Sequence, residues 1–139
     1  MDQQKQIEHM VLTCIDTAKA MLDEYELIMP FGIRSFNDSE DLKMNCPGDK
    51  NPEATSWNEQ IDMVVTELKA FVNNESIFST ALVTELESEG DKAIGLQVET
   101  ELSSVLFVYP YKRVDEAWVI DEPIQTDQLL TTVFDNNAA

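Results

Sequence analysis

The stretch FSTALVTELESEGDKAIGLQVETE, residues 78–101, decides the fold of this chain. Apolar and polar side chains alternate along its first half and again along its second half, which is the period of β-strands. Segment 88–92, between the two halves, contains Gly90 and predicts a hairpin loop. Pairing the strands about Gly90 places Leu86 opposite Ile94. In this register the apolar side chains share one face of an antiparallel sheet.

The chain upstream of this hairpin begins with a predicted helix. Apolar residues recur three and four positions apart from Ile7 to Tyr25, and Pro30 requires the helix to end before it. Segments 33–36 and 41–45 then predict two short strands joined by a polar turn.

A second helix is expected before the hairpin, and its start has two candidates. Asn51 can cap it with Pro52 at the first helical position, or Ser56 can cap it with Glu59 completing a capping box. Two helices and consecutive hairpins predict an α+β fold. We expect an antiparallel sheet of about five strands with two main helices, in the order α-β-β-α-β-β-β plus a short terminal strand.

Beyond the hairpin, segment 105–109 is apolar at every position. Such a strand is either covered on both faces of the sheet or forms an interface, and in the second case it predicts a homodimer. Segments 117–120 and 125–134 predict two further short elements, and residues 136–139 are expected to fray. The length fits one domain over residues 1–139.

The charge of the chain limits its partners. It carries 27 acidic residues against 9 basic ones, a formal net charge of −18. Nucleic acid and anionic membranes need a basic footprint, so neither is an expected partner. The acids are spread evenly over the two halves of the sequence. Two interpretations remain, a solvated coat that favours solubility or a surface that binds a basic protein.

The predicted hairpin offers one set of candidate site residues. In the register given above, four carboxylates gather on the face opposite the apolar side chains, namely Glu85, Glu87, Glu99 and Glu101. Two carboxyl groups about 5 Å apart can carry out acid–base chemistry. An ordinary solvated sheet face has the same pattern, so these residues are binding candidates and no catalytic residue is assigned.

Aromatic residues and one arginine form the second set. Phe31 lies in a Pro-Phe-Gly turn, and Tyr109 and Tyr111 flank the proline at the end of the apolar strand. Arg113 belongs to the only adjacent basic pair of the chain. Tyr and Arg are enriched at binding hot spots, whereas a tyrosine at the edge of a core commonly packs with only its hydroxyl in water.

Motifs for catalysis, cofactors and metals are missing from the sequence. One histidine and two cysteines are too few for a closed zinc site, and the acids that follow Asp38 depart from the EF-hand pattern. There is no nucleophile elbow and no glycine-rich phosphate loop, so neither a cofactor nor a metal is expected. Without a leader, a membrane-spanning run or a disulfide framework, a cytoplasmic location is expected.

The layout resembles a group of small bacterial α+β proteins of uncharacterised function. In that group an opening helix runs into a Pro-Phe-Gly turn and a late strand ends in Pro-Tyr. The matching pieces here are Met29-Pro30-Phe31-Gly32, Ala93-Ile94 with Glu99, and Pro110-Tyr111. The likeness covers roughly residues 10–125 and departs in the acidic surface and in the second helix. It implies no known activity and assigns no functional residue.

Together these observations favour a non-catalytic, cytoplasmic binding or interaction domain whose partner is a basic protein. The alternative is a small-ligand-binding domain or an enzyme that uses carboxylates and tyrosines. A concave pocket with converging polar groups would distinguish that alternative.

Overall fold

The computed structural model describes residues 2–47, 56–126, 128–130 and 132–134, which contain two helices and seven strands. In chain order these are α1 (Gln3–Tyr25), β1 (Phe31–Phe36), β2 (Leu42–Asn45), α2 (Trp57–Asn74), β3 (Ile77–Ser88), β4 (Asp91–Glu99), β5 (Ser104–Val114), β6 (Ala117–Ile120) and β7 (Ile124–Thr126). All pairings are antiparallel, and the strands lie in the order β2-β1-β3-β4-β5-β6. The α+β prediction is confirmed. The sheet exceeds the expected five strands because β6 and β7 both pair with β5.

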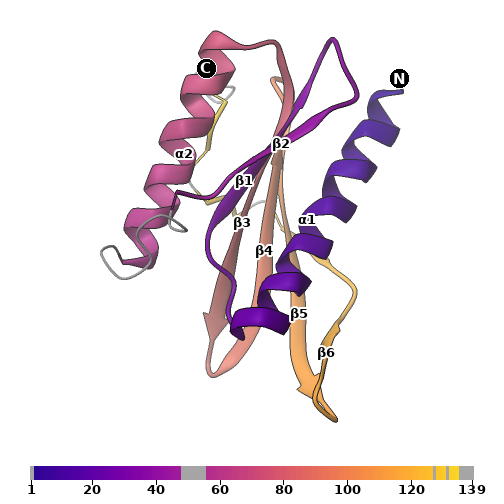
Figure 1. The fold of residues 1–139 in the computed structure, drawn as a ribbon, viewed down its shortest axis with the longest axis vertical. Helices are drawn as coiled ribbons and strands as arrows, with labels where there is room; N and C mark the ends of the chain where they lie inside the picture. The colour runs from indigo at the N-terminus through magenta and orange to yellow at the C-terminus, as the bar shows by residue number, and fades with distance from the viewer. Residues whose placement is uncertain (1, 48–55, 127, 131, 135–139) are drawn as a thin grey trace.

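The two helices lie on opposite faces of this sheet (Figure 1). Helix α1 packs against β1, β3, β4 and β6, whereas α2 packs mainly against β1 and β3. Coverage on both faces explains why β3 buries consecutive residues such as Ala81, Leu82 and Val83. One of these faces is called here the α1 side and the other the α2 side.

The start and end of α1 follow from its capping residues. The carboxylate of Asp2 accepts a hydrogen bond from the Gln4 amide at 2.9 Å, which satisfies one of the free amides of the first turn. Met10, Cys14 and Ala18 face the sheet and are fully buried, as the helical spacing predicts. The helix ends at Glu26, which is left-handed with φ of 59° and donates its amide to the Leu22 carbonyl.

Helix α2 starts at the second of the two candidate caps. The Ser56 hydroxyl accepts a hydrogen bond from the Glu59 amide at 3.2 Å, and the helix begins at the next residue, Trp57. The other candidate, Asn51 with Pro52, lies outside the described residues. Val64 and Leu68 are fully buried and pack towards Leu82 in β3.

The predicted register of the central hairpin is wrong by one residue. The loop is a two-residue turn of Glu89 and Gly90, with φ of 55° and 88°, and Ser88 pairs with Asp91. Glu85, not Leu86, therefore lies opposite Ile94. A shift of one residue moves every side chain of a strand to the other face relative to its partner, which changes the site predicted from this hairpin.

Most of the apolar side chains of β5 are covered, some on one face of the sheet and some on the other. Val105, Phe107 and Tyr109 pack on the α1 side, and Leu106 is buried on the α2 side. These contacts agree with the first of the two interpretations of segment 105–109, a strand that is covered on both faces of the sheet. The homodimer through this strand stays a prediction.

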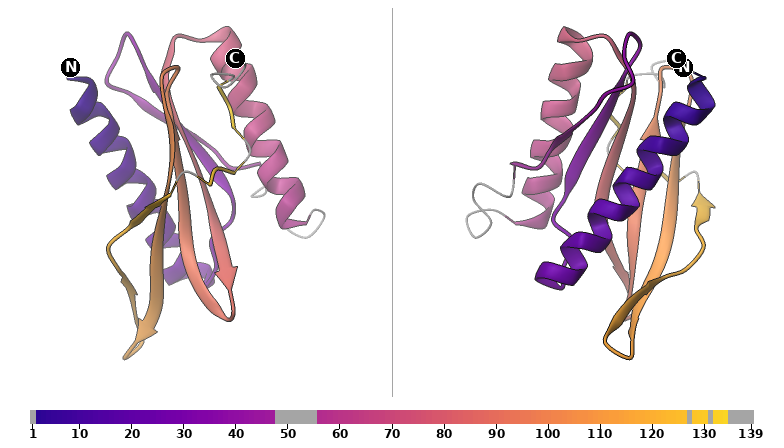
Figure 2. Two further views of the ribbon diagram at one scale, coloured as in Figure 1. Left: turned by 180° about the vertical axis from the view of Figure 1, so that it is seen from behind. Right: turned by 45° about the vertical axis from the view of Figure 1, so that its right-hand side comes forward.

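Residues 128–130 and 132–134, called here the C-terminal segment, lie on the α2 side of the sheet, and the last of them run beside α2 (Figure 2). Val133 and Phe134 are buried there, each with 6% of its surface exposed. The predicted last element therefore packs in part as an irregular segment, and residues 136–139, expected to fray, lie outside the described part. In the described ranges, neither helix is long and apolar enough to cross a membrane.

Candidate functional site

Two of the four aromatic and arginine candidates, Phe31 and Tyr109, belong to the core. Phe31 starts β1 and has none of its surface exposed, because the turn that holds it points its ring under α1. Tyr109 is half-buried on the same side, and burial raises the pKa of its hydroxyl. Phe31 therefore cannot touch a partner on the surface of this structure.

The other two candidates, Tyr111 and Arg113, are brought together where α1 ends. The Tyr111 hydroxyl donates a hydrogen bond to Glu85 Oε1 at 2.6 Å. Its ring meets the edge of Trp118 in β6, with 5.8 Å between ring centroids. Burial raises the pKa of Tyr111 well above its ordinary value, and the bond to the Glu85 carboxylate adds to the increase.

Arg113 connects the end of α1 to the hairpin of β5 and β6. Its guanidinium pairs with the Glu26 carboxylate and lies 5.2 Å from the centre of the Trp118 ring. The arginine and glutamate side chains are 46% and 66% exposed, so this pair contributes little to stability. Sequence reasoning missed Trp118. Its place in a short strand directly opposite Arg113 became evident only from the pairing of β5 with β6.

The four glutamates do not form one face. In the observed register Glu85 and Glu87 lie on the α1 side, beside Ile94 and Lys92 respectively. Glu99 lies on the other side and is buried with 1% exposure, and Glu101 is exposed in the turn after β4. The predicted carboxylate cluster is therefore dissolved by the one-residue difference in register.

Glu99 instead holds the C-terminal segment. Its two carboxylate oxygens accept from the Val133 amide at 2.8 and 3.1 Å, and one also accepts from the Ser104 hydroxyl at 3.2 Å. Two residues earlier, Gln97 Oε1 accepts from the Leu130 amide at 2.6 Å. Burial raises the pKa of Glu99, and these hydrogen bonds offset only part of the increase. The sequence gives little indication of the roles of Glu99 and Gln97, because both occupy polar positions of an alternating strand, which are expected to face solvent.

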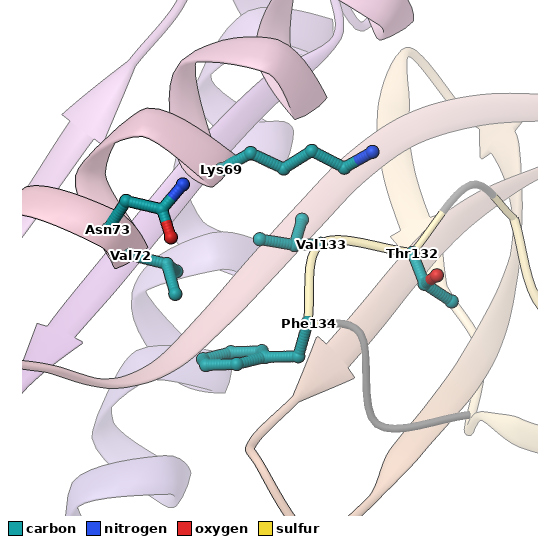
Figure 3. Close-up of a pocket in the computed structure, with 6 residues that line it drawn as sticks. All are labelled: Lys69, Val72, Asn73, Thr132, Val133 and Phe134. Atoms are coloured by element: carbon teal, nitrogen blue, oxygen red, sulfur yellow. The ribbon is translucent and has the colours of Figure 1, made fainter. Parts of the chain in front are cut away.

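A hollow of about 430 Å³ lies between α2 and this segment (Figure 3). Lys69, Val72 and Asn73 line it from α2, and Val133 and Phe134 face them from the other side. Lys69 is the single titratable side chain among its described lining residues. The described lining residues therefore do not supply the pair of acid and base groups that general acid–base catalysis needs.

The acidic residues that are evenly spread in the sequence gather in space. The last turn of α1, the turn between β3 and β4 and the turn between β5 and β6 lie at one end of the molecule (Figure 1). This region, called here the acidic end, consists of segments 23–26, 87–92 and 112–122. It contains ten acidic and three basic residues. These 21 residues have a net charge of −7. If the net charge of −18 were spread evenly over all 139 residues, they would carry less than half of that charge.

Two of the candidate groups, Tyr111 and Glu99, are engaged in hydrogen bonds within the structure. A tyrosine with a raised pKa keeps its proton near neutral pH, so Tyr111 cannot serve as a base. Glu99 is enclosed by the residues that bind it, and no substrate atom reaches it in this arrangement. Within the described ranges, no three His, Cys, Asp or Glu side chains lie close enough together to hold a metal ion.

Comparison of the chain with protein-family models, with curated proteins and with solved structures finds no match.

Proposed function

We propose that this protein is a non-catalytic, cytoplasmic interaction domain that binds a basic protein through its acidic end. The observation that carries the proposal is the concentration of ten carboxylates against three basic groups where three separate segments meet. Such a surface attracts cationic partners and speeds their association. The two cysteines, Cys14 and Cys46, are thiols and not a disulfide, which suits a reducing compartment.

Screening explains why the position of the charge matters more than its total. The Debye length is about 8 Å at physiological ionic strength, so exposed charges farther apart hardly act together. Helix α1 has 23 residues and is therefore about 34 Å long at 1.5 Å per residue. It runs from one end of the molecule to the other (Figure 1). Carboxylates near its start contribute little to the potential at the acidic end.

The alternative, a small-ligand domain or an enzyme using carboxylates and tyrosines, has less support. Tyr111 and Glu85 satisfy each other with a hydrogen bond, and Glu99 binds backbone amides of its own chain. Neither arrangement leaves a converging set of polar groups for a small molecule.

The experiment compares two variants that have the same net charge. One is Glu89→Gln with Asp115→Asn and Glu116→Gln, which neutralises three exposed carboxylates at the acidic end. The control neutralises three exposed carboxylates near the opposite end, Glu8→Gln with Asp38→Asn and Glu40→Gln. The probe is a ten-residue peptide of alternating Lys and Ser, titrated by calorimetry at about 20 and 200 mM salt, which brackets the physiological Debye length.

We expect the wild-type protein to bind this peptide at low salt and to lose most of the affinity at high salt. The variant at the acidic end should bind several-fold more weakly than the control variant at low salt. Equal affinities of the two variants would contradict the proposed location. Absence of any salt-sensitive binding to the wild-type protein would contradict the proposed function itself.

A further inference from the structure

We propose that an uncovered apolar face beside the acidic end is the docking surface for the partner, and that it takes a segment combining apolar side chains with Lys or Arg. This inference rests on the proposed function and specifies the chemistry of its partner. The surface, called here the open face, lies on the α2 side of the sheet and consists of Leu86, Ala93, Val108, Pro110, Val119 and Ile124.

Strand register places these residues on one side of the sheet. Leu86 pairs with Ala93, and Ala93 pairs in turn with Pro110, so the three form a row across β3, β4 and β5. Val108 is two residues from Pro110 along β5 and pairs with Ile124 of β7. Val119 of β6 pairs with Lys112, which is two residues from Pro110 in the other direction along β5. Because residues that pair directly, or that stand two apart on a strand, share a face, the six side chains form one surface.

Nothing among the described residues covers this part of the sheet. Helix α2 packs mainly against β1 and β3, and the C-terminal segment binds β4 through Gln97 and Glu99, towards the other end of the strand. On the opposite face, α1 reaches as far as β6 and buries Tyr111. Among the described residues, this end of the sheet is therefore packed by a helix on the α1 side but not on the α2 side.

Two of the six side chains of the face are exposed and the other four are half-buried. Ile124 is 62% exposed and Val119 is 39% exposed. Part of the face is concave, because Leu86, Ala93, Val108 and Pro110 line a hollow of about 460 Å³. An apolar surface with a hollow in it and polar residues around it is typical of an interaction site.

Gly95 makes room for the Leu86 side chain, which lines this hollow. A Cβ atom at position 95 would lie 2.8 Å from Leu86 Cδ1 and 3.0 Å from its Cγ, which is closer than real Cβ contacts. The Leu86 side chain therefore occupies the space above the glycine and lies against its own sheet.

Charge identifies the kind of occupant. Glu87, Asp91 and Asp121 also line the hollow, as do Lys92 and Lys112, and all five belong to the acidic end, whose net charge is −7. A second copy of this chain would bring an equally acidic surface against the first and would be repelled. A cationic segment with apolar side chains complements both the face and its surroundings.

The experiment uses two ten-residue peptides, one of alternating Lys and Leu and one of alternating Lys and Ser. The protein variant is Val119→Ser with Ile124→Ser, and the matched control is Leu12→Ser, which removes an exposed side chain (64%) from the outer surface of α1. Affinities are measured at low salt after thermal unfolding has shown that both variants fold. Because all three positions are exposed, we expect little change in stability.

We expect the Lys-Leu peptide to bind the wild-type protein about tenfold or more tightly than the Lys-Ser peptide. The double variant should lose this difference, and the control should keep it. If the Lys-Ser peptide binds but the leucines add nothing, or if the double variant keeps the full difference, the docking surface is wrong and the proposed function stands. If neither peptide binds the wild-type protein, both are wrong.

Discussion

Two polar side chains of β4 in apolar surroundings hold the C-terminal segment in place. Glu99 and Gln97 occupy positions of β4 that face α2 and the C-terminal segment, and both accept hydrogen bonds from backbone amides of that segment. Arg34 is the basic residue of the sheet that lies closest to Glu99 across the strands, with Thr80 between the two. It forms its ion pair with Glu75, at 2.9 Å. The Glu99 carboxylate is thus buried with hydrogen bonds but without an ion pair in the described part of the structure.

This environment predicts a pH dependence of stability. Because burial raises the pKa of Glu99 in the folded protein, folding favours the protonated form, and the ionised form costs stability above the raised value. The wild-type protein should therefore gain stability relative to Glu99→Gln as the pH falls from 7 towards the ordinary value of about 4.3. Urea unfolding at intervals across this range measures the difference in free energy.

The control for this prediction is Glu101→Gln, which removes the same charge from an exposed turn two residues away. Its difference from the wild-type protein should be small throughout the range. A difference between wild type and Glu99→Gln that stays constant from pH 4 to pH 7 would contradict a raised pKa at this site.

At the scale of elements, the turns decide which face each strand presents. Both phases of β3 are apolar around Leu82, so periodicity alone permits two registers. The dipeptide Glu89-Gly90, with both residues left-handed, closes the hairpin in two residues where a five-residue loop was expected. Glycine at the second position of a two-residue turn is the signal in the sequence that favours the observed register.

The turn between β5 and β6 gives a test of this local physics. Asp115 and Glu116 have φ of 50° and 67°, a region that residues other than glycine, asparagine and aspartate adopt at a cost, so the cost falls on Glu116. We expect Glu116→Gly to raise the free energy of unfolding by about 1 kcal/mol and the melting temperature by a few degrees. Thermal and urea unfolding of the purified variant measure both.

The matched variant is Glu122→Gly, which removes the same charge near the same end but from a residue without positive φ. It should leave stability unchanged or lower it, because glycine only adds freedom to the unfolded chain there. If both variants are stabilised equally, relief of charge repulsion and not backbone conformation is the cause.

At the scale of the whole molecule, the sequence predicts the architecture better than the site. Helical spacing around Met10 and Cys14 and the capping box at Ser56 lead to the observed helices. The placement of the helices on opposite faces could not be predicted, since it depends on which phase of each strand meets which helix. Phe31 was chosen for its turn and is buried, because a turn motif says nothing about what packs over it.

The position of the acidic end could not be predicted from the sequence either. The two halves of the sequence have nearly equal charge, and no single segment is exceptional. Three turns distant in sequence become neighbours only when β3, β4 and β5 pair and α1 ends beside them (Figure 1). A surface of this kind depends on topology, and composition predicts only the sign of its partner.

The most direct test of the proposed role is a residue-by-residue map of where a cationic probe binds. Amide chemical shifts of the wild-type protein, recorded while the Lys-Ser peptide is added at low salt, provide that map. We expect changes concentrated in segments 23–26, 87–92 and 112–122, which disappear at high salt. Changes centred on the opposite end, at the start of α1 and the turn between β1 and β2, would contradict the proposed role.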